Sequence, residues 1–190
     1  MGRRPAFDAP SVVTAARDRF WQNGFDETSL PDLEQATGLS RSSIYHAFGS
    51  KRGLFDAAVA DYLACVVAPR LTLLSGPDGV DAYFASLARD IASSGTQRRG
   101  CLLITTAATS AAHDETLAVV VNAYREALTE AIGGALTARG DADVETRSRI
   151  LVTMSVGALL QARVDRTEAL AVIDAARMLA RGWTSSVTAL

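Results

Sequence analysis

The most informative stretch of this sequence reads Gly-Leu-Ser-Arg-Ser-Ser-Ile-Tyr-His-Ala-Phe-Gly-Ser-Lys and runs from Gly38 to Lys51. Gly38 suits a sharp backbone turn with positive φ, and Ser40 follows it as a helix N-cap. Residues 41–48 then predict a short helix, which Gly49 ends. The stretch therefore predicts a turn that leads into a short helix with its own start and stop signals.

A second short helix is expected immediately before this turn. Ser29 can cap its N-terminus, Pro31 is tolerated in the first helical turn, and Asp32 occupies the acidic position of a capping box. Leu33 lies on its apolar side, and the helix should end at Gly38. Two short helices joined by a tight glycine turn are typical of a helix-turn-helix.

Helical patterns also dominate the rest of the chain. Residue 69 and residues 75–79 are expected to mark a loop. No segment shows the sustained alternation of a strand, so we predict an all-α protein of about nine helices. The further helices are expected at residues 10–23, 51–67, 80–93, 101–112, 114–139, 144–164 and 167–183. We expect a three-helix domain that contains the helix-turn-helix over residues 1–50 and a second, larger helical domain over residues 51–190.

Composition is compatible with such a protein. The chain has 190 residues, of which 48% are hydrophobic, and its formal net charge is −2. This length supports one or two ordinary domains. The segment from Leu39 to Gly53 departs from the acidic balance, because it holds Arg41, Lys51 and Arg52 and no acidic residue. A local basic surface of this kind is what a DNA-binding protein needs.

The two cysteines and the apolar runs exclude several other classes. Cys65 and Cys101 form no Cys-x-x-Cys pair, so neither a zinc ribbon nor a redox dithiol is indicated. No apolar run approaches the roughly 20 residues of a membrane span, and no signal peptide is recognisable. We therefore expect a cytoplasmic protein without a membrane partner and without a cofactor.

The residues around the turn resemble the DNA-binding domain of the tetracycline-repressor (TetR) family. The resemblance covers about residues 10–55 and rests mainly on two patterns, Phe25-x-x-Thr28-Ser29-Leu30-x-x-Leu33 and Tyr45-x-x-Phe48-x-x-Lys51-x-x-Leu54. It implies that Tyr45 and Lys51 contact phosphates and that Thr28 or Ser29 anchors the preceding helix to the DNA backbone. The residues that it places at or near base edges are Arg41, Ser42, Ser43 and His46, and Ser40, the predicted N-cap, is a further candidate for DNA contact. Glu34 departs from the small residue common in the family.

The resemblance also implies that residues 1–50 are the DNA-binding domain and that residues 51–190 are an effector-binding and dimerisation domain. The protein would be a homodimer that pairs through its last two helices and a repressor that binds double-stranded, palindromic operator DNA. A small, mostly apolar ligand would release the operator. Apolar walls with a few hydroxyl groups suit such a ligand, although each candidate also suits an ordinary core. The candidate effector residues are Tyr62, Tyr83, Phe84, Leu87, Leu103, Thr106, Thr109, Ser110, His113, Tyr124 and Met154.

Other interpretations of the sequence stay open. A small helical enzyme is one, but the chain has only two histidines, His46 and His113, and no recognised hydrolase or metalloprotease motif. A metal-responsive regulator is another, and a DNA-binding architectural protein without an effector is a third. Cys101, which lies near a helix start and two arginines, is either a reactive sensor thiol or a buried core residue.

Overall fold

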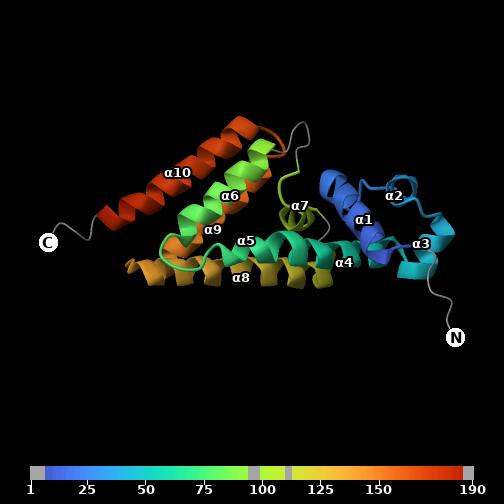
Figure 1. Cartoon of the computed structure of the whole chain (residues 1–190), viewed down its shortest axis with the longest axis horizontal. Coiled ribbons are helices and arrows are strands. Elements are labelled where there is room, and N and C mark those ends of the chain that lie inside the picture. Colours follow the sequence, from blue (N-terminus) through green and yellow to red (C-terminus); the bar gives the residue numbers. More distant parts are fainter. Residues whose placement is uncertain (1–6, 94–98, 110–112, 186–190) are drawn as a thin grey trace. The chain divides into compact units, whose positions relative to one another are not determined.

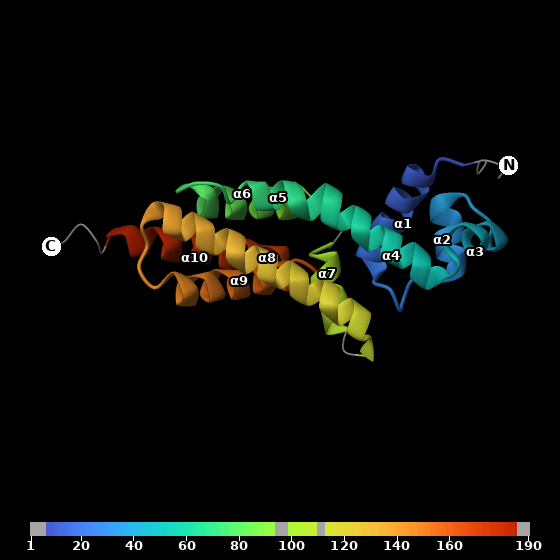
Figure 2. The ribbon, with the colours of Figure 1, turned by 90° about the horizontal axis from the view of Figure 1, so that it is seen from below.

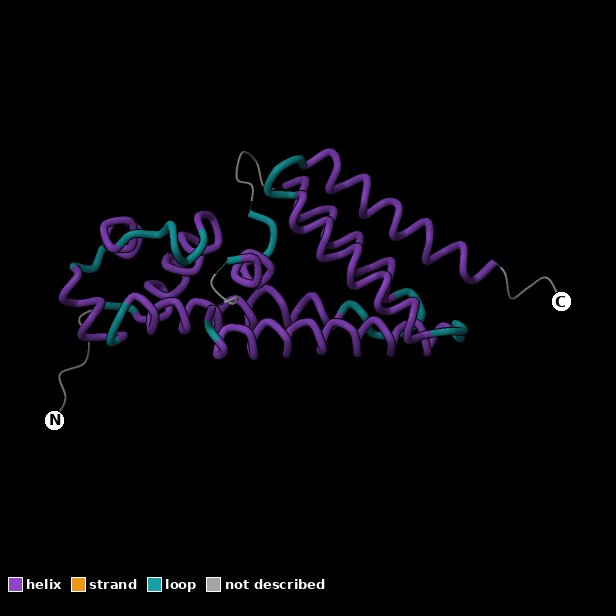
Figure 3. The backbone as a smooth tube through the Cα atoms, turned by 180° about the vertical axis from the view of Figure 1, so that it is seen from behind, coloured by secondary structure: helices purple, strands orange, loops and turns teal. Residues whose placement is uncertain are grey.

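The computed structural model describes residues 7–93, 99–109 and 113–185 of the chain. Figure 3 shows helices and loops, and no strand, over these residues. They form nine continuous helices, because α4, η1 and α5 follow one another in the chain without a non-helical residue. The all-α prediction is thus confirmed. The chain divides into two compact units, Met1–Val67 and Ala68–Leu190.

The first unit contains α1 (Ala9–Asn23), α2 (Leu30–Thr37), α3 (Arg41–Phe48) and α4 (Lys51–Tyr62). Helix α1 packs against both α2 and α4, and α3 packs against α2 and α4 (Figure 1). The core is aromatic at its centre, where the rings of Phe20 and Phe55 meet edge to face at 5.0 Å. Leu33 of α2 and Ile44 of α3 are fully buried, so both short helices are fixed to this core.

The helix ends of the first unit follow the predicted signals. Ser29, Ser40 and Ser50 are the N-caps of α2, α3 and α4, and each side chain accepts a backbone N–H three residues later. Gly38 ends α2 in the left-handed conformation, with φ at 70°. An L-residue with a Cβ is strained there, so the turn between α2 and α3 depends on glycine.

The first unit ends in a π-helical turn. Helix α4 is followed by η1 (Leu63–Val67) and then, in the second unit, by α5 (Ala68–Thr72). The prediction that Pro69 marks a loop was wrong, because Pro69 lies in α5 and the loop begins only after Thr72. Pro69 has no backbone N–H to donate to the helical ladder, and the π-type pairing ends two residues before it.

The second unit continues with α6 (Gly79–Ser93), α7 (Leu102–Ala108), α8 (Glu115–Arg139), α9 (Val144–Gln161) and α10 (Arg166–Ser185). Helix α9 packs against α8 and α10, and α10 also packs against α6 (Figure 2). No helix in the described ranges is long and apolar enough to cross a membrane.

Ion pairs join helices of the second unit at two places. Asp81 of α6 accepts two hydrogen bonds of 3.0 Å from Arg177 of α10. At the turn between α8 and α9, the Asp141 carboxylate pairs with Arg139 at 2.5 Å and with Arg147 at 2.6 Å. These pairs fix α6 to α10 and α8 to α9.

The compact units part after Val67, whereas the sequence analysis placed the functional division after residue 50. Helix α4 packs against α1 and α3, so it shares the core of the first unit. The assignment of residues 51–67 to the effector-binding part stays a prediction.

Candidate nucleic-acid interface

Helix α3 presents a polar surface opposite its buried side. Ile44 is fully buried, which turns one side of the short helix into the core. Arg41, Ser42, Tyr45 and His46 are exposed on the remaining surface, and Ser43 is half-buried. These five side chains carry hydrogen-bonding groups of the kind that contact phosphates and base edges. The structure therefore gathers on one helix the residues expected to contact bases.

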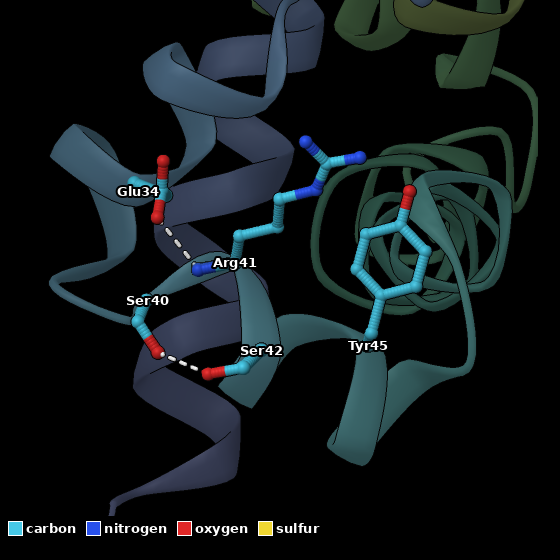
Figure 4. Close-up of a pocket in the computed structure, with 5 residues that line it drawn as sticks. All are labelled: Glu34, Ser40, Arg41, Ser42 and Tyr45. Carbon is cyan, nitrogen blue, oxygen red and sulfur yellow. Dashed lines mark hydrogen bonds between the residues drawn. The ribbon is translucent and has the colours of Figure 1, made fainter.

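Three serine hydroxyls form a connected group at the N-terminus of α3. The Oγ of Ser40 accepts the backbone N–H of Ser43 at 3.3 Å. The same atom lies 3.0 Å from the Oγ of Ser42, a contact drawn in Figure 4, and 2.9 Å from the Oγ of Ser43. Ser40 is thus first a capping residue, which holds the start of α3 in place, and its neighbours provide hydroxyls at the surface.

Arg41 and Tyr45 interact with each other one helical turn apart. The guanidinium carbon of Arg41 lies 5.6 Å from the centre of the Tyr45 ring, within the range of a cation–π contact. The Tyr45 side chain is nevertheless 41% exposed, so ring and hydroxyl remain accessible from solvent. This contact limits the positions that the long arginine side chain takes at the surface.

Glu34 reaches from α2 to the start of α3. Its Oε1 atom accepts the backbone N–H of Arg41 at 2.6 Å (Figure 4). Together with Ser40, Arg41, Ser42 and Tyr45 it lines a surface hollow of about 530 Å³. The sequence analysis noted Glu34 only as a departure from the family pattern. An acid beside a helix N-terminus is electrostatically favourable, but Glu34 lies in α2, and only the turn between the two helices brings it to the start of α3.

Lys51 lies at the start of α4 against an aromatic ring. Its Nζ atom is 4.5 Å from the centre of the Phe25 ring. The neighbouring Ser50 caps α4 by accepting the Gly53 N–H at 3.0 Å. Arg52 donates to Asp56 at 2.7 Å, and this acid lies just beyond the stretch from Leu39 to Gly53. The positive charge at the surface is therefore smaller than the three cations of that stretch predicted. Of these two cations, Arg52 pairs with an acid, whereas Lys51 has no acidic partner among the residues that the structure describes.

Thr28 and Ser29 are placed differently from one another. The Thr28 side chain is fully buried and donates its hydroxyl hydrogen to the Gly24 carbonyl at 2.6 Å. Ser29 is exposed and forms a capping box with Asp32, whose carboxylate accepts the Ser29 hydroxyl at 2.6 Å and the Ser29 N–H at 2.9 Å. These bonds lower the pKa of Asp32. Of the two, Ser29 is the residue with a side chain at the surface.

The predicted effector residues fall into several environments. Tyr62 belongs to the first unit, where its ring meets Trp21 edge to face at 4.8 Å. Met154 is half-buried, Thr109 and His113 are exposed, and Ser110 lies outside the described residues. The buried members in the second unit are Tyr83, Phe84, Leu87, Leu103, Thr106 and Tyr124.

Tyr83 was predicted as an effector residue, but its hydrogen-bonding partner Ser155 was not. The hydroxyl oxygens of Tyr83 and Ser155 lie 2.7 Å apart, and neither side chain is more than 1% exposed. Burial raises the pKa of Tyr83 to about 12, although the bond to Ser155 acts in the opposite direction. Cys101 is also buried, at 1% exposure, and lies at the N-cap position of α7. Six of the effector candidates are thus buried in the second unit, and one of them, Tyr83, is hydrogen-bonded to Ser155.

Comparison with known proteins gives a consistent result. Residues 12–58 match the family described as bacterial regulatory proteins, tetR family. The HTH-type transcriptional regulator YezE of Bacillus subtilis (strain 168) is 34% identical over 62% of each chain. The HTH-type transcriptional repressor ComR of Escherichia coli (strain K12) is 34% identical over 54% of this chain and 51% of its own length. The chain thus spans about half to three fifths of these curated relatives.

The likeness to solved structures extends further along the chain. The TetR family transcriptional regulator CifR, solved as a cysteine mutant with 26-base-pair double-strand operator DNA, is 31% identical to this chain with a TM-score of 0.77. That match covers 96% of this chain and all of the CifR chain. From the helix-turn-helix, the matched family and this near-complete likeness, it follows that the chain belongs to the TetR family of transcriptional regulators.

Proposed function

We propose that this protein is a sequence-specific DNA-binding repressor, which binds a palindromic operator as a homodimer and is released by a small effector. The observation that carries this proposal is the exposed polar surface of α3, with Arg41, Ser42, Tyr45 and His46, beside Lys51 of the same compact unit. A helix of this size fits the major groove of duplex DNA, where hydrogen-bonding side chains distinguish base pairs. Such a role belongs to the compartment that holds the chromosome, in bacteria the cytoplasm.

A second surface, which is apolar, supports dimerisation through the last two helices. Large apolar side chains are exposed on α9, on α10 and just after α9, namely Ile150, Leu160, Val164, Met178 and Leu179. Several apolar neighbours, such as Leu151 and Ile173, are buried inside the unit, so the helices have both a core side and an exposed apolar side. Exposed apolar patches of this kind favour a protein partner. A second copy would bring two recognition helices to two half-sites.

The buried group in the second unit supports an effector role. Tyr83, Ser155 and Thr106 are polar groups among buried Phe84, Leu87 and Leu103. A mostly apolar ligand with one hydrogen-bonding group suits such surroundings. An effector acts on DNA binding only if it binds the two states of the dimer with different affinity. Because Cys101 is buried, it serves packing in this state, and a role as a sensor thiol is the less favoured alternative.

The test begins with selection of duplexes from a randomised pool by the purified protein. The selected duplexes and random DNA are then titrated by fluorescence anisotropy at two salt concentrations. A palindrome bound at least a thousandfold, in order of magnitude, more tightly than random DNA supports the proposal. Only weak, salt-sensitive binding without a consensus contradicts it. An operator affinity that no candidate metabolite alters favours the architectural alternative over the effector-released repressor.

A further inference from the structure

The hollow at the start of α3 contains an acid on a surface that is proposed to face DNA. Glu34 lines this hollow together with Arg41, Ser42 and Tyr45 (Figure 4). A carboxylate repels phosphate and offers only hydrogen-bond acceptors, so the DNA backbone is an unfavourable neighbour for it. In the major groove, the groups that donate hydrogen bonds are the exocyclic amino groups of cytosine and adenine. On a surface that faces DNA, a base amino group is thus a more favourable neighbour for Glu34 than a phosphate.

The geometry of Glu34 leaves acceptor capacity for such a contact. One oxygen, Oε1, accepts the Arg41 N–H at 2.6 Å, and this bond fixes the carboxylate at the N-terminus of α3. An ionised carboxylate has about four lone-pair positions, so one backbone bond does not exhaust it. The bond to the helix also holds the side chain in one orientation, which reduces the entropy lost when a base binds.

The second polar group of the hollow selects between cytosine and adenine. The Arg41 side chain lines the same hollow, with its guanidinium held against the Tyr45 ring. Arginine donates most effectively to O6 and N7 of guanine. The base paired with guanine is cytosine, whose amino group lies on the major-groove edge of the same pair. Arg41 and Glu34 thus offer the donor and the acceptor that the two bases of a guanine–cytosine pair require.

We infer that Glu34 and Arg41 together specify a guanine–cytosine pair in each operator half-site, with Glu34 accepting from the cytosine amino group. This inference rests on the proposed function, because it presupposes an operator. It makes Glu34 a specificity-determining residue at a position where the family pattern has a small one.

The test compares base preferences of the wild type, Glu34→Gln and Arg41→Ala. Each position of the selected operator is changed to all four base pairs, and dissociation constants are measured by anisotropy. Glutamine keeps an oxygen for the Arg41 N–H but replaces the other acceptor by an amide donor. At one symmetric position we expect the wild type to favour the guanine–cytosine pair by about five- to 150-fold. Glu34→Gln and Arg41→Ala should each weaken that preference, because each removes one of the two contacts to the pair, and both should retain the preferences at the other positions.

Two controls separate readout from charge and from folding. Glu130→Gln removes one negative charge from an exposed position of α8 and should leave every preference unchanged. Glu34→Gln should still unfold cooperatively, with a fall in stability of no more than about 0.3–1 kcal/mol from the lost charge at the N-terminus of α3. Unchanged preferences in Glu34→Gln, or an equal loss of affinity for all sequences, would overturn the inference. A wild type that selects no operator at all would instead overturn the proposed function, and this inference with it.

Discussion

Gly53 lies so close to Phe48 that a Cβ atom at residue 53 would be 2.0 Å from the Phe48 carbonyl oxygen. The first turn of α4 thus touches the last turn of α3 through backbone atoms, and only glycine leaves room for the contact. This approach fixes the end of the recognition helix against the helix that carries Lys51.

Gly53→Ala should destabilise the first unit. The carbonyl is backbone and cannot rotate away, so the cost should be about 1–3 kcal/mol or more of unfolding free energy. Urea unfolding followed by circular dichroism measures it. Gly134→Ala is the matched control, because Gly134 lies inside helix α8 and a Cβ atom added there would meet no neighbouring group within 4 Å. That control should be neutral or stabilising by about 0.4–1 kcal/mol, and equal losses in both variants would contradict the steric explanation.

Lys51→Ala should weaken binding to all DNA sequences alike. The ammonium group is proposed to contact a phosphate, so its loss removes one counterion-releasing contact and lowers the magnitude of the salt slope by about 1. Anisotropy titrations of the selected operator at four salt concentrations give this slope. Arg149→Ala removes a cation from an exposed ion pair on α9 and should leave the slope unchanged. A changed base preference in Lys51→Ala would argue against a phosphate contact.

The double variant Tyr45→Ala with Lys51→Ala should lose operator binding while its thermal unfolding stays close to that of the wild type. The Tyr45 side chain is 41% exposed, so its removal opens no buried cavity in the first unit. Binding that persists in the folded double variant would remove both residues from the interface.

Tyr83 should make the protein sensitive to alkali. Its pKa in the folded state is about 12, above the ordinary value of 10, because burial disfavours the phenolate. A raised folded-state pKa gives stability that is fully present below pH 10 and lost as the pH rises from about 10 to about 12. Urea unfolding at about pH 9, 10 and 11 should show this fall in the free energy of unfolding, and Tyr83→Phe should make the fall smaller. Tyr45→Phe, which removes an exposed phenol, should behave as the wild type does.

Charge placed on the exposed apolar side of α9 and α10 should prevent dimerisation. Met178 is 66% exposed and Leu160 is 47% exposed, so the variant Met178→Glu with Leu160→Glu should fold as a monomer. Val119→Glu is the control, since Val119 on α8 is 62% exposed yet lies outside the proposed interface. Sedimentation velocity distinguishes the two species. A dimer that survives the double change would place the interface elsewhere.

Much of the fold could be predicted because its signals are local. Ser29 and Ser40 cap the helices that they precede, and Gly38 adopts the expected left-handed turn. The bond between Glu34 and Arg41 could not be predicted in the same way, because it joins two helices and depends on the geometry of the turn between them. Burial of the Thr28 hydroxyl and pairing of Tyr83 with Ser155 likewise arise from packing, which short patterns do not encode.

The π-helical turn over Leu63–Val67 has a consequence for comparing this chain with its relatives. A π turn contains one more residue than an α turn needs, so a homologue that lacks one residue here retains a continuous helix. Single-residue gaps in this segment should therefore be read as changes of helical register, and not as loss of an element. In a sequence alignment with homologues, Leu54 before the segment and Val80 after it are suitable fixed positions, because both are buried.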